Sequence, residues 1–277
     1  MHPGTLRAGG HVTGATRGRS LSVVVPAYNE ERRLPALLVL LDTDASRLFG
    51  PAGLRLEEVI VVDDGSNDGT RRLLETCTEL EGRLRVLSLE ANRGKGAAVR
   101  LGMLAATGDC VLLTDADMSA PLDQVTTLAA ELDRGFDLVL GSRGLPESQI
   151  LVHQNDVRER LGKLYNRLVR ALTGLPIHDT QCGFKLFRRA SARRLFELQT
   201  VDGFAFDVEL CVNALRLGLR VSEVPVTWAN DPETRVKLFR SSTRMAMDLL
   251  RIRRRARAAP GASFAPQSSP RVEPSGD

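Results

Sequence analysis

The chain has 277 residues, enough for one sizeable α/β core with terminal extensions. Hydrophobic residues make up 43% and charged residues 26% of it, which are ordinary values for globular proteins and exclude a fibrous or largely disordered chain. The net charge is +4, and basic residues crowd 158–170 and 235–257, which favours an anionic partner. Only 4% of residues are aromatic, and no zinc-finger or RNA-recognition signature is present, so we expect membrane phosphates rather than nucleic acid as that partner.

The ends of the chain and its cysteines indicate where the protein works. Residues 1–20 hold five glycines and residues 258–277 four prolines, and we predict that both segments are disordered. The four cysteines lack C-x-x-C spacing, which is typical of reduced thiols in a cytoplasmic protein. No signal segment and no apolar run near the ~18 residues of a membrane span is visible. We therefore expect a cytoplasmic protein, bound peripherally to the cytoplasmic face of a membrane.

Short apolar runs alternate with helical patterns along the first half of the chain. Five of these runs are predicted strands: Leu21–Val25, Val59–Val62, Leu84–Leu89, Cys110–Thr114 and Phe136–Leu140. Strands that are apolar on both faces and separated by helices predict a mostly parallel sheet with helices on both sides, an α/β fold. Beyond residue 142 we predict helices near 157–173 and 204–217, a turn at 174–183 and a strand at 221–226, all within one domain spanning 21–240.

Polar residues directly follow three of the predicted strands, at Pro26–Glu30, Asp63–Ser66 and Asp115–Asp117. Ligands bind beyond the carboxyl ends of such strands, so we expect the three segments to meet in one cleft. Asp115 and Asp117 are two residues apart, and extended chain would point both carboxylates to one face. Such a pair suits Mg²⁺ or Mn²⁺, which take their remaining ligands from water and substrate phosphates. The alternative is that they cap the next helix.

Two glycine-containing segments predict a nucleotide site. Asp63–Thr70 follows a buried strand, and its acids could accept hydrogen bonds from a base or ribose, although turn chemistry explains its glycines equally well. Asn92–Gly96 precedes a helix, where backbone N–H groups and cations could face a diphosphate. Ala97 replaces the Ser or Thr of a P-loop and Val99 the third glycine of a dinucleotide fingerprint, so neither of those motifs is present.

The second half of the chain holds two further polar segments. His178–Lys185 is a dense polar run that points to function, and a Cys182–His178 nucleophile is one alternative that it leaves open. Asp207 and Glu209 open a predicted helix on different faces, so at most one points into a given site. Solvated helix charges are the competing interpretation for both.

Two helices combine an apolar stripe with many arginines. In the first, the stripe is Leu161, Leu164, Tyr165, Leu168 and Leu172, and we expect it to pack on the core. The second is a basic amphipathic helix over 241–257, preceded by Arg240, with seven arginines from Arg240 to Arg257. For this helix we expect Met245, Leu249 and Ile252 to enter an anionic membrane surface.

Taken together, these motifs resemble those of family 2 glycosyltransferases, which have a GT-A, Rossmann-like fold. The resemblance covers about residues 21–250. Six segments carry it: Val25–Glu30, Val62–Ser66, Gly94–Gly96, Asp115–Asp117, Gly141–Arg143 and Asp179–Lys185. The last of these, with Phe206–Glu209, is similar to dolichyl-phosphate β-glucosyltransferases and their prokaryotic polyprenyl-phosphate relatives. Ser119 stands where mannosyl relatives often carry Gln, which makes mannose transfer a weaker expectation.

The resemblance implies roles for individual residues. It implies that Asp115 and Asp117 hold the metal and that Gln181, Lys185 and Asp207 bind the acceptor. The catalytic residues would be Asp117, Asp207, Arg143 and Lys185. The residues that bind the nucleotide-sugar donor would be Pro26, Ala27, Tyr28, Glu30, Asp64, Lys95, Asp115 and Ala116.

The expected reaction is an inverting transfer of glucose from UDP-glucose to a polyprenyl or dolichyl phosphate. A phosphate acceptor is largely ionised near neutral pH, so Asp207 or Glu209 would position it rather than deprotonate it. One alternative is a related enzyme that uses GDP-mannose or a soluble acceptor. Another, from a different class, is a non-catalytic nucleotide-binding membrane adaptor. The sequence specifies no oligomeric state.

Overall fold

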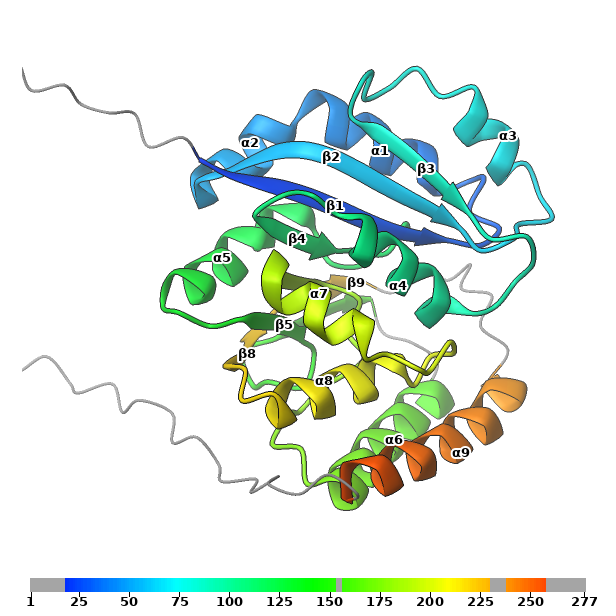
Figure 1. Cartoon of the computed structure of the whole chain (residues 1–277), viewed down its shortest axis with the longest axis vertical. Helices are drawn as coiled ribbons and strands as arrows, with labels where there is room; N and C mark the ends of the chain where they lie inside the picture. The colour runs from blue at the N-terminus through cyan, green and yellow to red at the C-terminus, as the bar shows by residue number, and fades with distance from the viewer. Residues whose placement is uncertain (1–17, 153–155, 230–237, 258–277) are drawn as a thin grey trace, which may run out of the picture.

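A computed structural model describes residues 18–152, 156–229 and 238–257. Its core is a seven-stranded sheet in the order β3-β2-β1-β4-β7-β5-β8, parallel except for β7 (Figure 1). The strands are β1 (Arg19–Ala27), β2 (Leu54–Asp63), β3 (Leu84–Ser88), β4 (Cys110–Leu113), β5 (Leu138–Ser142), β7 (Lys185–Arg188) and β8 (Val221–Pro225). A separate parallel pair joins β6 (Gln149–Val152) to β9 (Thr227–Ala229). The predicted α/β class with a mostly parallel sheet is confirmed.

Alternation along the central strands divides the core into two layers. In β1, Val23 and Val25 pack on one face of the sheet, whereas Val24 packs on the other. In β4, Leu112 and Leu113 likewise pack on opposite faces. Both faces are covered because successive side chains of a strand point in opposite directions. The result is a rigid sheet whose strand ends can hold side chains in fixed positions.

Different helices cover the two faces (Figure 1). Helices α1 (Leu34–Thr43), α2 (Ala45–Phe49) and α5 (Val125–Asp133) supply one layer. The other layer contains α4 (Lys95–Ala105), α7 (Arg189–Glu197), α8 (Phe206–Arg216), α6 (Asp156–Thr173) and α9 (Leu238–Arg257). Short helices α3 (Thr70–Glu75), η1 (Gly50–Ala52) and η2 (Leu122–Gln124) complete the connections.

Several details differ from the sequence predictions. Strand β1 begins at Arg19, so residues 19 and 20 are ordered strand rather than part of a disordered leader. Strand β7 was not predicted, because its four residues follow a polar segment that lacks any strand signal. Helix α7, which follows it directly, was missed too. The segments 1–17 and 258–277, which we predict to be disordered, lie outside the described residues.

Helices α6 and α9 correct the two predictions made for amphipathic helices. Leu249 and Ile252 of α9 are 0% and 3% exposed and belong to the core, so they cannot enter a membrane. In α6 the prediction holds in part, since Tyr165 and Leu172 pack against the core, whereas Leu161, Leu164 and Leu168 are exposed. The reason is that α9 packs against both α8 and α6, which covers its apolar stripe. No described helix is both long enough and apolar enough to cross a bilayer.

Candidate functional site

The strand order changes direction between β1 and β4, and in such sheets ligands bind in the crevice beyond the carboxyl ends of these strands. Four of the predicted donor residues stand at the end of β1. Pro26 and Ala27 are its last residues, Tyr28 is exposed, and Glu30 is half-buried. The Tyr28 hydroxyl accepts a hydrogen bond from the side-chain amide of Asn67, 3.4 Å away. This bond ties the end of β1 to the segment that follows β2.

Asp64 fixes the next segment of the crevice rather than standing free in it. Its two carboxylate oxygens accept the backbone N–H groups of Arg93 and Gly94 at 2.8 and 2.9 Å. Gly94 has φ 118°, and a Cβ there would stand 2.5 Å from the carbonyl oxygen of Asp202, so glycine is required. Asp64 therefore shapes the 92–96 segment and can also accept bonds from a ligand with its remaining lone pairs.

Two carboxylates, those of Asp115 and Asp117, follow the end of β4, and their charges act on a third, that of Glu30, which is paired with Arg33 at 2.6 Å. The chain turns at Ala116 and Asp117, so the two aspartates are not in extended chain as the sequence suggested, and Ala116 is buried beneath them. Burial raises the pKa of Glu30 to about 7, and Asp117 and Asp115 add to the increase. Burial, followed by repulsion from Asp115, raises the pKa of Asp117 above its usual value. All three groups therefore lie within one electrostatic cluster.

The metal-binding atoms available here suit a hard divalent cation. They are the carboxylate oxygens of Asp115 and Asp117, and burial together with repulsion from Asp115 raises the pKa of Asp117. No group of three or more His, Cys, Asp or Glu residues forms a metal cage within the described ranges. A site with one or two protein carboxylates is what Mg²⁺ or Mn²⁺ uses when phosphate oxygens and water complete the shell.

Lys95 brings the first cation of the site to these acids. It is the first residue of α4, and its ammonium lies 2.6 Å from Oδ1 of Asp115. Burial alone would lower the pKa of Lys95, but Asp115 and Asp207 outweigh it and hold the pKa above its usual value. Lys95 is thus charged beside the helix N-terminus, an arrangement that suits an anionic phosphate.

Arg143 brings the second cation, from the end of β5. Its guanidinium makes a bidentate ion pair with Asp179, with Nε to Oδ2 at 2.6 Å and Nη2 to Oδ1 at 3.0 Å. It also lies 5.3 Å from the centre of the Trp228 ring. Glu223 accepts the backbone N–H groups of His178 and Asp179, so the start of the 178–185 segment is held in place. Arg143 remains partly exposed with donors to spare.

Gly183 brings the 178–185 segment against the metal-site acids. A Cβ at this position would stand 2.0 Å from Oδ2 of Asp115, so only glycine permits the contact. Gln181, two residues earlier, is half-buried, and its backbone N–H donates to Asp179 at 3.1 Å. The sequence-predicted acceptor segment and the predicted metal ligands are therefore direct neighbours.

Lys185 and Asp207 form an ion pair below the surface of this cluster. The Lys185 ammonium is 2.6 Å from Oδ1 of Asp207, and the two residues are 0% and 3% exposed. We predicted that both contact the acceptor; in the structure described they are buried and bound to each other, and their contact with an acceptor stays a prediction. The interpretation of Asp207 and Glu209 as solvated helix charges is also wrong. Glu209 is buried and accepts the backbone N–H groups of Thr200 and Val201.

The alternative of a cysteine nucleophile is disfavoured by the environment of Cys182. The thiol is 1% exposed, and burial raises its pKa to about 11, so it stays protonated near neutral pH. His178 is turned toward Glu223, with Nδ1 3.1 Å from Oε2. His178 is therefore engaged by Glu223 rather than by this thiol.

Tyr165 is a residue that the sequence analysis treated only as packing. Its hydroxyl is buried in α6 and has no hydrogen-bond partner among the described residues. Burial raises its pKa, and the charges of Asp207 and Asp248 add to the increase, so the hydroxyl lies on the Asp207 side of the site. An orphaned donor would have been hard to infer, because tyrosine fits the apolar stripe of α6 equally well.

Comparison with known proteins identifies the class. Residues 22–196 match the family model for Glycosyl transferase family 2, and the chain belongs to this family. It is 39% identical over 240 residues to the dolichyl-phosphate beta-glucosyltransferase of Drosophila melanogaster, covering 84% of this chain and 74% of the relative. The human protein of that name is 36% identical over 247 residues, covering 86% and 76%. The predicted family is therefore confirmed.

Solved structures identify the fold as GT-A. The chain resembles a crystal structure of glucosyl-3-phosphoglycerate synthase from Mycobacterium tuberculosis in complex with phosphoglyceric acid, with a TM-score of 0.62, 24% identity, and coverage of 85% of this chain and 80% of that one. A second structure of that enzyme, in complex with Mn²⁺, uridine diphosphate and phosphoglyceric acid, gives a TM-score of 0.60 at 21% identity, covering 88% and 81%. At these identities the likeness concerns the fold alone.

Proposed function

We propose that this glycosyltransferase moves glucose from UDP-glucose onto the phosphate of a dolichyl or other polyprenyl lipid, with inversion at the anomeric carbon. Relatives at 36–39% identity carry the name dolichyl-phosphate beta-glucosyltransferase. The structural observation that carries the proposal is the packing of Gly183 against Asp115. It brings the predicted acceptor segment, residues 178–185, next to the acids that would hold the donor diphosphate.

The donor would lie along the ends of β1, β2 and β4. In this proposal Pro26, Ala27, Tyr28 and the Asp64 segment form the nucleoside side, with Glu30 close by. Lys95 and the N-terminus of α4 face the diphosphate, where both a fixed cation and the helix dipole favour negative charge. Ala116 allows the chain to turn closely beneath the donor.

Asp115 and Asp117 would hold Mg²⁺ or Mn²⁺ with one or both carboxylates. When bound, the ion would neutralise charge that develops on the leaving diphosphate. Lys95 shares this task from the opposite side of Asp115, to which it is paired at 2.6 Å. Because Lys95 and Asp115 neutralise each other in the structure described, we expect Lys95 to move toward the diphosphate once Asp115 binds the ion.

The acceptor phosphate would bind on the side of Arg143 and Gln181. Arg143 is partly exposed and oriented by Asp179, so its spare N–H groups can face phosphate oxygens. A phosphate monoester is largely ionised near pH 7, with a second pKa of about 6, so the attack requires no strong base. The buried Lys185–Asp207 pair would position Cys182 and Gly183 of this segment, since Lys185 also donates to the Cys182 carbonyl.

The acceptor lipid implies that the enzyme works at a membrane surface, and we propose that this is the cytoplasmic face, where nucleotide sugars are at hand. The test is a transfer assay with radiolabelled UDP-glucose, GDP-mannose and other donors, with polyprenyl phosphate extracted into organic solvent. We expect label in the lipid only with UDP-glucose and only with the phosphorylated lipid. Equal transfer to free polyprenol or to a soluble sugar would contradict the acceptor assignment, and label from GDP-mannose alone would contradict the donor.

A further inference from the structure

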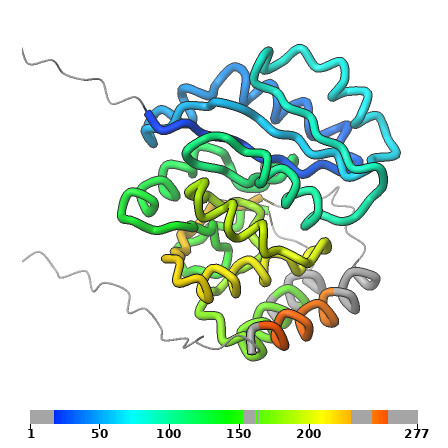
Figure 2. Tube along the Cα trace, viewed as in Figure 1, coloured from blue at the N-terminus to red at the C-terminus, as the bar shows by residue number. Residues whose placement is uncertain are grey.

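Helices α6 and α9 lie side by side at one end of the molecule, away from β1, β2 and β3 (Figure 2). Five of their side chains are large, apolar and exposed: Leu161, Leu164, Leu168, Met247 and Leu250. The most exposed of them are Leu164 of α6 at 61% and Met247 of α9 at 54%, and Leu250 is 48% exposed. Isolated exposed leucines are common, but five on two packed helices form a patch that requires a partner.

Leu164 of α6 and Met247 and Leu250 of α9 point away from the core. On α6, Leu164 is five residues before the buried Val169 and therefore on roughly the opposite side of the helix. On α9, Met247 and Leu250 lie about 140–160° around the helix from the buried Ile252. Leu161 and Leu168 lie about 40° around α6 from Tyr165 and Leu172, which pack on the core, so the patch begins at the edge of the core and extends outward to Leu164.

The charge on the two helices identifies the partner. Among the described side chains of α6 and α9 the only acid is Asp248, which is buried. The same residues include six arginines: Arg167, Arg170, Arg251, Arg253, Arg254 and Arg255. Apolar residues bordered by arginines are the composition of a surface that lies in the interface of an anionic membrane.

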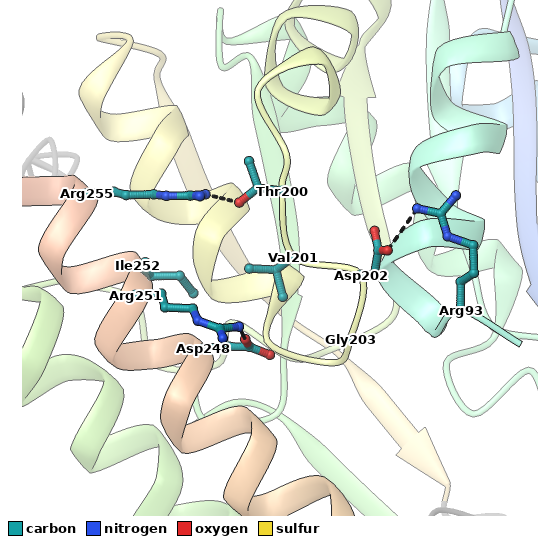
Figure 3. A pocket seen from close by; sticks show the side chains of 9 residues that line it. All are labelled: Arg93, Thr200, Val201, Asp202, Gly203, Asp248, Arg251, Ile252 and Arg255. Atoms are coloured by element: carbon teal, nitrogen blue, oxygen red, sulfur yellow. Dashed lines mark hydrogen bonds and ion pairs between the residues drawn. The ribbon is translucent and has the colours of Figure 1, made fainter.

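A hollow beside α9 combines three arginines with two acids. It has a volume of about 320 Å³, and Arg251, Arg255 and Asp248 line it on one side of residues 200–203, with Arg93 on the other (Figure 3). Arg93 is paired with Asp202, another lining residue, at 2.9 Å. Arg251 binds Asp248 through Nη1 at 3.1 Å, and Arg255 reaches the Thr200 hydroxyl. Each guanidinium has five N–H donors, so both arginines keep donors for an anion.

We propose that the exposed residues of α6 and α9, the α6–α9 surface, dock the enzyme on an anionic lipid bilayer. The leucines and Met247 enter the interface, and the arginines meet lipid phosphates. The proposal rests on the proposed function, because a lipid-phosphate acceptor supplies the reason to approach a bilayer. The position of Asp248 is consistent with the proposal. Asp248 is buried behind this surface, and its charge, like that of Asp207, raises the pKa of the Tyr165 hydroxyl. Docking here would bring the acceptor side of the site to the lipid headgroups.

Vesicle flotation of the full chain tests the surface. Neutral phosphatidylcholine vesicles are compared with vesicles that contain phosphatidylserine, at low and high salt. We expect binding to the anionic vesicles that falls with salt, because the arginines act through screened charge. The double variant Leu164→Gln with Leu250→Gln keeps residues that favour helix. It should lower the partition coefficient of the protein between vesicles and water about tenfold or more. Arg167→Gln with Arg254→Gln should weaken binding to the anionic vesicles and leave the neutral ones unaffected.

Val39→Gln is the matched control, since Val39 is 45% exposed on α1 and distant from this surface. The control should float as wild type does. Equal flotation of the leucine variant and wild type would overturn the proposal, as would an equal loss in the control. A wild-type dimer that the leucine variant converts to monomer would also overturn it, because the surface would then join two copies. Transfer of glucose to a short-chain, water-soluble polyprenyl phosphate should be the same in every variant as in wild type. If wild type showed no such transfer, the proposed function would be contradicted, whereas the flotation result would still stand.

Discussion

Gly183 approaches Asp115 so closely that a Cβ at position 183 would lie 2.0 Å from Oδ2 of the aspartate. The two residues are 68 positions apart in the chain, and they join the segment after β4 to the segment before β7. The antiparallel pairing of β4 with β7 produces this contact, because the start of β7 runs beside the end of β4. One glycine therefore connects the two halves of the site.

Substituting Gly183 should damage activity more than stability. In Gly183→Ala the added methyl group forces the Asp115 carboxylate away, and a misplacement of about 1 Å at a reacting centre can cost on the order of a hundredfold in rate. We expect kcat to fall by about that factor while the urea midpoint changes little. Gly162→Ala in α6 is the control, because nothing lies within 4 Å of its Cβ position. Similar kcat values for both variants would show that Asp115 does not need this placement.

Asp115→Asn and Asp117→Asn should each abolish most of the transfer activity, because each removes a charged ligand for the proposed ion. Chelation of divalent ions by EDTA should have the same effect on wild type, and Mn²⁺ or Mg²⁺ should restore it. Far-UV circular dichroism should stay native. Asp123→Asn provides an exposed acid near the same strand end as a control. Wild-type turnover in EDTA, or in either site variant, would refute the metal assignment.

The buried Lys185–Asp207 pair should be important mainly for stability and local order. Lys185→Met leaves Asp207 buried without its partner, which typically costs about 3–5 kcal/mol. We expect urea denaturation to show such a loss, and the double variant Lys185→Met with Asp207→Leu to recover much of it. If the single variant were as stable as wild type, the pair could not be the anchor of the 182–185 segment.

Much of this site was predictable because it depends on short-range patterns. The apolar runs before Pro26, Asp63 and Asp115 predict buried parallel strands, and the topology of such strands brings their ends together. The partners of Asp207 and Glu209 could not be predicted. Helical spacing shows only that the two acids lie on different faces, and their partners Lys185 and Thr200 come from other elements.

The two amphipathic helices show where pattern alone fails. An apolar stripe predicts that one face of a helix is covered, but it does not identify what covers it. Leu249 of α9 is covered by neighbouring helices, whereas Leu164 of α6 remains exposed. Strand β7 was missed for a related reason, because its pairing with β4 and β5 is a long-range property that four residues cannot signal.

Tyr165→Phe should separate acceptor binding from folding. The Tyr165 hydroxyl is buried without a partner among the described residues, and its pKa responds to Asp207. A buried donor without a partner destabilises a protein, so a purely structural hydroxyl would make Tyr165→Phe neutral or stabilising with unchanged kinetics. If instead the hydroxyl donates to the acceptor phosphate, its loss should raise KM for polyprenyl phosphate about tenfold, which corresponds to about 1.4 kcal/mol.

Two quantities should not change in Tyr165→Phe: the KM for the sugar donor, and the rate of slow donor hydrolysis in the absence of acceptor. Tyr28→Phe at the end of β1 is the matched comparison, since it should alter donor kinetics and leave the acceptor KM unaffected. An unchanged acceptor KM in Tyr165→Phe, together with a raised urea midpoint, would assign the hydroxyl to neither binding nor catalysis.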